Sequence, residues 1–123
     1  MNELKELTKA EEQIMHELWE MNGGFVKEVI DRLPEPKPAY NTVSTIIRIL
    51  ETKGFVDHES FGKSHRYFPI IRKEEYKKII TGKLLNNYFD NSATSMLSFF
   101  LEEKKLDIDD LDQILQLINK NRN

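Results

Sequence analysis

The segment from Tyr40 to Ile70 constrains the fold of this chain most strongly, because its periodicity changes from helical to strand-like at a glycine. It reads YNTVSTIIRILETKGFVDHESFGKSHRYFPI. From about Asn41 to Lys53, apolar side chains recur at helical spacing, and short polar side chains occupy the other side. Gly54 is typical of a helix end, Phe55 begins a strand, and residues 61–64 form a turn. The segment therefore predicts a helix followed by a β-hairpin.

The polar side of this helix and the basic residues of the hairpin are candidates for DNA contacts. These candidates are Tyr40, Asn41, Thr42, Ser44, Thr45 and Arg48 in the helix, with Lys63, His65 and Arg66 in the hairpin. Short polar side chains reach base edges from a helix in the major groove, and arginine grips guanine or phosphate with two hydrogen bonds. Basic hairpin residues hold the register on phosphates. This combination is the layout of a winged-helix DNA-binding protein.

Several candidates have a structural alternative. Asn41 either caps the helix or binds an adenine edge. Tyr40 either contacts the DNA backbone or packs beside the preceding prolines. Arg48 is the strongest candidate for a base or phosphate contact, and its alternative is a surface ion pair with Glu51 or Glu59.

The distribution of charge supports DNA binding, although the whole chain carries a net charge of −3. Residues 1–36 have four Lys/Arg against nine Asp/Glu, whereas residues 37–70 have five against three. Local charge determines whether phosphates are attracted. Because the cations are few, we expect that strong binding requires two copies of the chain.

Cysteine and histidine, the residues that most often bind transition metals, are sparse. The chain has no cysteine, and its three histidines are scattered. We therefore predict no metal and no cofactor, and the alternative left open is a carboxylate-rich metal site. The sequence has no Ser/His/Asp arrangement, no phosphate-binding glycine loop and no paired buried carboxylates, so we predict no enzymatic activity. Of the histidines, His58 is expected to be structural, and His65 either joins the phosphate contacts or is simply solvated.

The remaining sequence predicts further helices. Thr8 and Glu11 have the spacing of a capping box, and the helix they open ends near Asn22. A second helix spans Val26 to Leu33, and a proline-rich connector precedes the helix near Asn41. The fold class is thus mainly α with a small β-hairpin wing: an N-terminal winged helix-turn-helix at residues 1–71 and a C-terminal helical dimerisation region at residues 72–123.

The C-terminal region predicts three helices, over Lys73–Phe89, over Ser92–Glu103 and after a cap at Asp107. Three helices alone leave apolar surface uncovered, so we expect pairing with a second copy. The predicted dimerisation residues are Tyr76, Ile80, Leu84, Tyr88, Leu97, Phe100, Leu101, Leu111, Ile114, Leu115 and Ile118. No apolar run approaches the about 20 residues that span a bilayer, and the first residues are too polar for a signal peptide. We expect no membrane insertion and a cytoplasmic location.

The ordered series of motifs resembles the BlaI/MecI/CopY (penicillinase repressor) family of bacterial winged-helix repressors. The matching runs are Leu7-Thr8-x-Ala10-Glu11, Ile14-Met15, Leu18-Trp19, Asn41-Thr42-Val43-x-Thr45, Arg48, Lys53-Gly54-Phe55-Val56-x-His58, Tyr67-x-Pro69 and Phe100-Leu101-Glu102-Glu103 with Leu106. The resemblance implies a homodimeric repressor that binds an inverted-repeat operator in double-stranded DNA. It also implies derepression by disruption of the dimerisation region, through a membrane sensor protease and cleavage near Phe99-Phe100.

Three departures from the family pattern bear on these expectations. Ile49 follows Arg48 where many relatives have a second basic residue, which affects the operator sequence. Phe99 stands where relatives cut by a sensor often have a polar residue, which affects the cleavage. The C-terminal cysteines of the copper-responsive branch are absent, which excludes copper release through thiolates. An alternative function is a winged-helix module that binds protein and has no operator, which the acidic N-terminal third favours.

Overall fold

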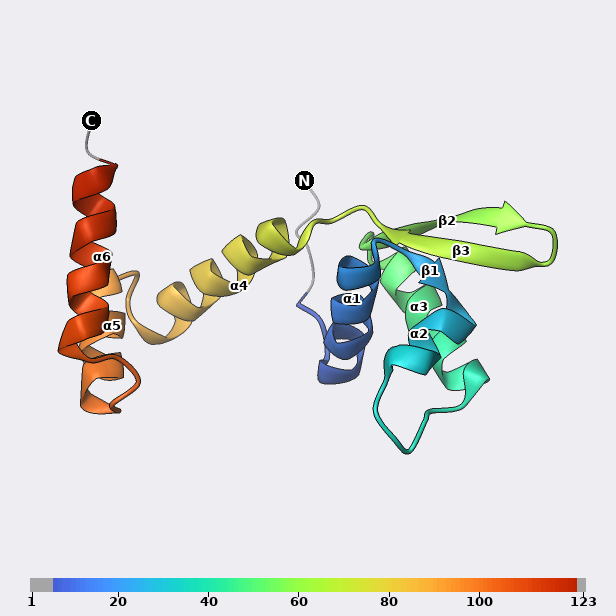
Figure 1. Cartoon of the computed structure of the whole chain (residues 1–123), viewed down its shortest axis with the longest axis horizontal. Coiled ribbons are helices and arrows are strands. Elements are labelled where there is room, and N and C mark those ends of the chain that lie inside the picture. The colour runs from blue at the N-terminus through green and yellow to red at the C-terminus, as the bar shows by residue number, and fades with distance from the viewer. Residues whose placement is uncertain (1–5, 122–123) are drawn as a thin grey trace. The chain divides into compact units, whose positions relative to one another are not determined.

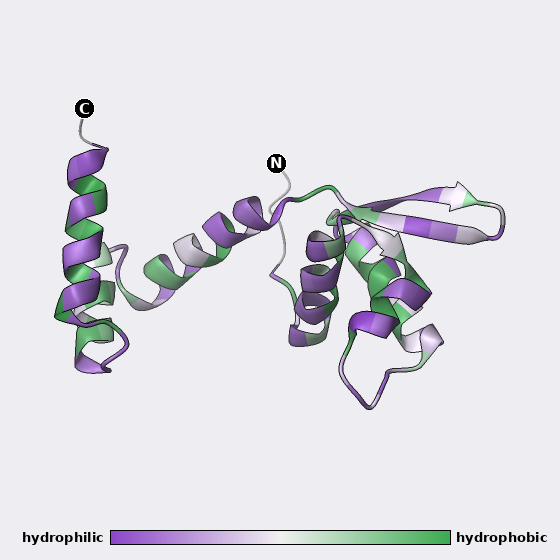
Figure 2. Cartoon of the chain, in the orientation of Figure 1, coloured by the Kyte–Doolittle hydropathy of each residue, from purple (hydrophilic) through white to green (hydrophobic). Residues whose placement is uncertain are grey.

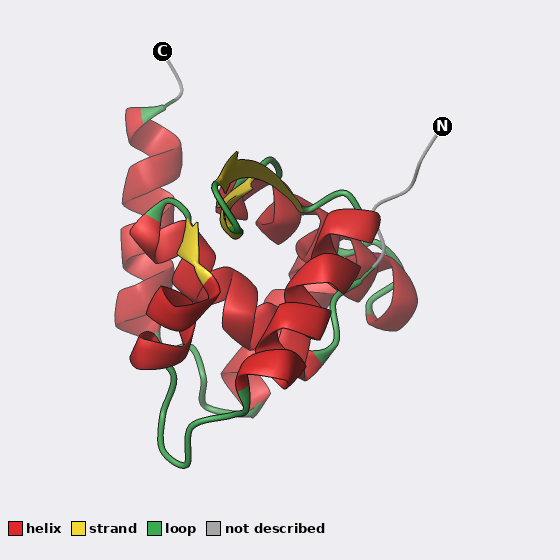
Figure 3. Cartoon of the chain, turned by 90° about the vertical axis from the view of Figure 1, so that its right-hand side faces the viewer, coloured by secondary structure: helices red, strands yellow, loops and turns green. Residues whose placement is uncertain are grey.

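The computed structural model describes residues 6–121 as a mainly helical chain with one small sheet (Figures 1 and 3). In chain order the elements are α1 (Lys9–Met21), β1 (Gly24–Phe25), α2 (Val26–Arg32), α3 (Tyr40–Thr52), β2 (Val56–Phe61), β3 (Ser64–Pro69), α4 (Lys73–Tyr88), α5 (Ala93–Glu102) and α6 (Ile108–Lys120). This confirms the predicted fold class. Contacts divide the chain into two compact units, residues 1–80 and 81–123. Among the described residues, no helix has the length and apolarity needed to cross a membrane.

The sheet has three antiparallel strands in the order β1-β3-β2, and the hairpin of β2 and β3 is the predicted wing. Its register pairs Val56 with Pro69 at the base and Phe61 with Ser64 at the tip. Strand β1 was not predicted, because two residues are too short to show a period. It places Gly24 opposite Tyr67 in β3. The wing is therefore joined to the segment between α1 and α2.

The predicted capping box at the start of α1 is confirmed. The Glu11 backbone N–H donates to Thr8 Oγ1 at 3.2 Å, and the Thr8 backbone N–H donates to Glu11 Oε1 at 2.9 Å. The same carboxylate oxygen accepts a hydrogen bond from Lys53 Nζ at 2.6 Å. Since Lys53 is the C-cap of α3, this ion pair joins the start of α1 to the end of α3.

The core of the first unit lies between α1, α2, α3 and the base of the wing. Its fully buried side chains are Phe55, Met15, Leu18, Ile47, Leu50, Val29, Val43 and Val56. The first turns of α4 complete this core, because Tyr76 is buried against Phe55, with ring centroids 5.4 Å apart. The Tyr76 hydroxyl accepts a hydrogen bond from the Leu7 backbone N–H at 2.8 Å. The winged-helix unit therefore includes the beginning of α4.

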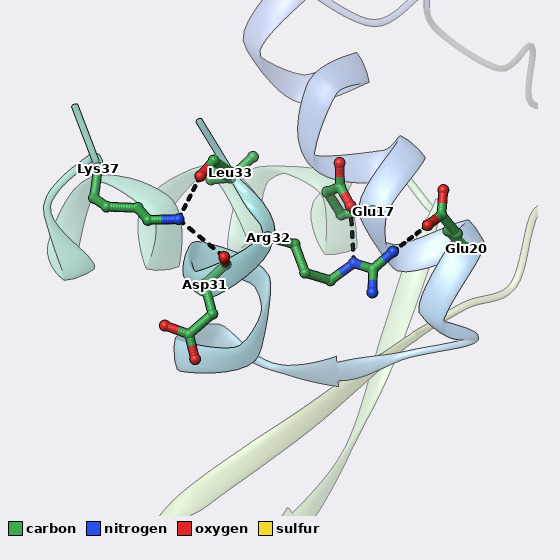
Figure 4. A network of polar contacts seen from close by, with 6 residues as sticks. All are labelled: Glu17, Glu20, Asp31, Arg32, Leu33 and Lys37. Atoms are coloured by element: carbon green, nitrogen blue, oxygen red, sulfur yellow. Dashed lines mark hydrogen bonds and ion pairs between the residues drawn. The ribbon is translucent and has the colours of Figure 1, made fainter. Parts of the chain in front are cut away.

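Figure 4 shows polar contacts that fix α2 and the connector leading to α3. Arg32 Nε donates to Glu17 Oε1 at 2.9 Å, and its Nη2 forms a second ion pair with Glu20, so α2 is held against α1. After the helix, Lys37 Nζ donates to the backbone carbonyl of Asp31 at 2.9 Å and also to that of Leu33. These bonds fold the proline-rich connector back onto the end of α2.

The second unit contains the rest of α4 with α5 and α6. Asp107 caps α6, as the sequence predicts, and forms a capping box with Asp110. Ser92 caps α5, a cap that was not predicted from the sequence. No residue of either helix is buried within the chain. Apolar and polar residues alternate along α6 (Figure 2). Its apolar side chains therefore remain largely uncovered by the residues that the structure describes.

Candidate nucleic-acid interface

Helix α3 has one buried side and one exposed polar side. Val43, Ile47 and Leu50 are fully buried. On the other side, Tyr40, Asn41, Thr42, Thr45 and Arg48 are exposed, and Ser44 is half-buried. The helix thus displays together the six side chains that the sequence proposed as DNA contacts.

The start of α3 removes one alternative for Asn41. Ala39 is the N-cap and makes no side-chain cap hydrogen bond, and the helix begins at Tyr40. Asn41 therefore lies within the first turn, and the prediction that it caps the helix is wrong. Its exposed amide is free to contact a base edge.

Arg48 lies at the centre of the exposed side, about one turn before the helix ends. Its Nη2 donates a long hydrogen bond of 3.5 Å to Thr45 Oγ1. In the described part of the chain it forms no ion pair, and Glu51, one of its two expected alternative partners, pairs with His58 instead at 2.7 Å. The guanidinium is therefore available to an external ligand.

The two basic residues of the wing lie in different environments. Lys63 is exposed in the turn between β2 and β3, and within residues 6–121 it forms no ion pair. Arg66 is half-buried, and its Nη2 donates to the backbone carbonyl of Asn22 at 3.0 Å. His65 is exposed, and its Nδ1 lies 3.2 Å from Ser60 Oγ. Of these two basic residues, Lys63 extends its charge into solvent, whereas Arg66 is held by the end of α1.

An aromatic residue at the wing tip was not among the predicted contacts. Phe61 is 51% exposed, and its ring packs edge-on against Phe25 with centroids 5.8 Å apart. Together with Tyr40 and His65 it lines a hollow of about 440 Å³ between the start of α3 and the wing. From the sequence, Phe61 was assigned to the turn. Continuing the strand alternation through residue 61 would have identified Phe61 as a strand residue at the wing tip.

The base of the wing is held to the end of α3. His58 Nδ1 and Glu51 Oε2 are 2.7 Å apart, and the His58 ring lies beside that of Tyr67. Burial of the Tyr67 hydroxyl is the largest cause that raises its pKa, and the negative charge of the nearby Glu51 carboxylate raises it further. These contacts agree with the structural role expected of His58.

The predicted dimerisation residues fall into two groups. Tyr76 and Ile80 pack against the core of the first unit. In the second unit Leu84, Tyr88, Leu101, Leu115 and Ile118 are exposed, whereas Leu97, Phe100, Leu111 and Ile114 are half-buried. Three further apolar side chains outside the predicted dimerisation set, Phe99, Ile108 and Leu117, are 47%, 81% and 58% exposed. The proposed cleavage position, Phe99-Phe100, lies inside α5.

Comparisons with known proteins agree with this arrangement. The chain matches the penicillinase repressor family over residues 7–120. It is 24% identical over 124 residues to the penicillinase repressor of Bacillus licheniformis, covering 100% of this chain and 97% of that protein. It is 22% identical to the methicillin resistance regulatory protein MecI of Staphylococcus aureus, covering 97% and 98%. The solution structure of the DNA-binding domain of the repressor BlaI matches with a TM-score of 0.53 and 26% identity, covering 62% of this chain and 94% of that domain. The chain therefore belongs to the penicillinase repressor family.

Proposed function

We propose that this transcriptional repressor binds an inverted-repeat operator as a homodimer, with α3 in the major groove and the wing against the adjacent backbone. The observation that carries the proposal is the exposed side of α3. It presents hydroxyl, amide and guanidinium groups, and among the described residues its arginine forms no ion pair. Such groups read base edges by hydrogen bonding.

Each residue of the interface has an expected duty. Arg48 contacts guanine or phosphate, and Asn41, Thr42 and Thr45 contact base edges or phosphates. We expect Ser44 and Tyr40 to contact the sugar-phosphate backbone of the DNA. In the wing we expect Lys63, exposed in the turn, to contact a phosphate, and His65 follows two residues later on β3.

Dimerisation is supported by the apolar surface of the second unit. Its exposed large apolar side chains are Leu84, Tyr88, Phe99, Leu101, Ile108, Leu115, Leu117 and Ile118. An uncovered set of this size in a small unit marks a protein interface. A second copy covers it symmetrically and doubles the few cations of the DNA-binding side, which raises the affinity for a site with two halves.

We also propose that loss of this dimer releases the operator in the cytoplasm, either by disruption of the second unit or by cleavage near Phe99-Phe100. That bond lies within α5, whose N–H groups are hydrogen-bonded in the helix. A protease needs an extended segment, so the helix has to unwind before cleavage. A membrane sensor protease is the expected partner of such a step.

Selection of bound fragments from the native genome at near-physiological salt tests the operator. Enrichment of one motif with dyad symmetry is expected, whereas no enrichment would favour the protein-binding module. On the enriched fragment, Arg48→Ala should weaken binding at least about 30-fold. Each copy of the dimer loses one arginine contact, and each contact contributes about 1–3 kcal/mol. Arg72→Ala is the matched control, since Arg72 is a highly exposed arginine outside the interface. Unchanged binding by Arg48→Ala would show that α3 does not read the operator.

A further inference from the structure

We propose that Glu51, Asp57 and His58 form a binding site for a divalent transition-metal ion at the base of the wing. One ligand atom from each residue lies within 4.8 Å of the other two. Glu51 belongs to the last turn of α3, and the other two residues belong to the start of β2. The turn at Gly54 therefore brings together groups that show no metal-ligand spacing in the sequence.

The donor atoms determine the class of ion. One imidazole nitrogen and two carboxylate oxygens suit Zn²⁺, Mn²⁺, Fe²⁺ or Ni²⁺ better than Ca²⁺, which prefers a full shell of oxygens. Ligands about 2.1 Å from an ion at tetrahedral angles are about 3.4 Å apart. The distance of 2.7 Å between His58 Nδ1 and Glu51 Oε2 therefore has to open by less than 1 Å. An ion bound through Nδ1 takes the place of any proton on that nitrogen, so the neutral imidazole then carries its proton on Nε2.

The surroundings orient the imidazole and leave access for an ion. The side chains of His58 and Glu51 are 32% and 29% exposed, so the site is partly shielded but open to solvent. The His58 ring packs beside the rings of His65 and Tyr67, at centroid distances of 4.4 Å and 5.6 Å. These ring contacts restrict the rotation of the imidazole and hold it beside the two carboxylates. The remaining coordination positions are left to water.

The position of the site gives the ion a consequence for DNA binding, which rests on the function proposed above. Residues 37–70 contain three acidic side chains, and two of them, Glu51 and Asp57, belong to the site. A divalent cation cancels the charge of both beside the wing. Since attraction to phosphate depends on local charge, the bound ion should strengthen binding to duplex DNA of any sequence.

Calorimetric titration of the full chain, freed of metal by a chelator, tests the site with zinc chloride and manganese chloride separately. We expect one equivalent per chain for at least one ion, with affinity at least tenfold lower in Asp57→Asn and in His58→Gln. Glu59→Gln on the same strand and His16→Gln on α1 are matched controls and should bind as wild type. Circular dichroism identifies any variant that fails to fold, and Asp57→Asn alters an exposed residue. Absence of saturable binding, or equal affinity in Asp57→Asn, would overturn the site.

The coupling to DNA is measured separately, by fluorescence anisotropy with a short duplex of arbitrary sequence at low salt. The ion should raise the affinity of wild type for the duplex severalfold more than it raises the affinity of Asp57→Asn. The comparison with Asp57→Asn corrects for binding of the ion to the DNA itself. An equal change in both proteins would overturn the coupling even if the titration shows the site. Failure of wild type to bind duplex in the presence of chelator would instead count against the proposed function.

Discussion

The ion pair between Glu11 and Lys53 should contribute measurably to the stability of the first unit. Glu11 is only 6% exposed, and the side chain of Lys53 is 19% exposed. Breaking a fully buried pair costs about 3–5 kcal/mol, whereas exposed pairs contribute about 0–1 kcal/mol. The burial of this pair lies between these cases, so Lys53→Met should lower the free energy of unfolding by about 2 kcal/mol. The methionine keeps the apolar stem, so the loss reports the charge and its hydrogen bond.

Urea unfolding followed by tryptophan fluorescence measures this effect, because the single tryptophan, Trp19, lies in the first unit. Lys9→Met, an exposed lysine on α1, is the control and should change stability by less than about 0.5 kcal/mol. All variants are compared at one protein concentration, since association changes apparent stability. A double-mutant cycle with Glu11→Gln isolates the pair. The reasoning fails if Lys53→Met matches the control or if the two changes are additive.

The same pair predicts a pH dependence. Burial raises the pKa of Glu11, but the hydrogen bonds from Lys53 and from the Thr8 backbone lower it further than burial raises it. The net shift is downward from an ordinary value of 4.5, so folding favours the ionised form. The stabilisation is complete above that value and is lost as the pH falls through the lower folded-state pKa. Unfolding free energies between pH 6 and pH 3, roughly the window around the ordinary carboxyl pKa, should fall less steeply in Lys53→Met.

Three further changes address the wing, the sheet and the second unit. Lys63→Ala should reduce the slope of log affinity against log salt by about 2 per dimer, because each copy loses one phosphate contact, and an unchanged slope would contradict this. Gly23→Ala should destabilise by more than about 1 kcal/mol in thermal unfolding, since φ is +105° and the added Cβ would lie 2.8 Å from the Tyr67 carbonyl oxygen; unchanged stability would contradict this. Ile118→Asp should shift sedimentation from dimer to monomer while the first unit stays folded, and a persistent dimer would place the interface elsewhere.

The helix ends were predictable because their signals are local. Thr8 and Glu11 are three residues apart, and the hydrogen bonds that they form depend only on this spacing. The cap at Asp107 was likewise identified from local sequence. The exposed side of α3 was predictable because helical periodicity fixes which residues are buried together. These features needed no knowledge of distant parts of the chain.

Contacts between distant residues could not be predicted in this way. The two residues of β1 carry no period, and their pairing with β3 depends on how the chain returns after the wing. The closeness of Glu51, Asp57 and His58 depends on the angle of the turn between α3 and β2. The sequence shows these three residues without a ligand spacing, so it predicted no metal site. Their geometry exists only after the helix and the strand have packed.

The two arginines of the proposed interface show how a contact with a distant residue alters the role expected from sequence. Spacing places Arg48 on the exposed side of a helix, and its surroundings agree with that expectation. Arg66 has the same chemistry, but it donates to the carbonyl of Asn22, the C-cap of α1. Helix ends carry carbonyl groups without intrahelical partners, so an arginine near one is readily held there. A phosphate contact by Arg66 has to use the donors that this hydrogen bond leaves free, whereas Lys63 carries no such restraint. We therefore expect α3 to read the operator, Lys63 to supply most of the electrostatic attraction of the wing, and Arg66 to set the direction in which the wing extends.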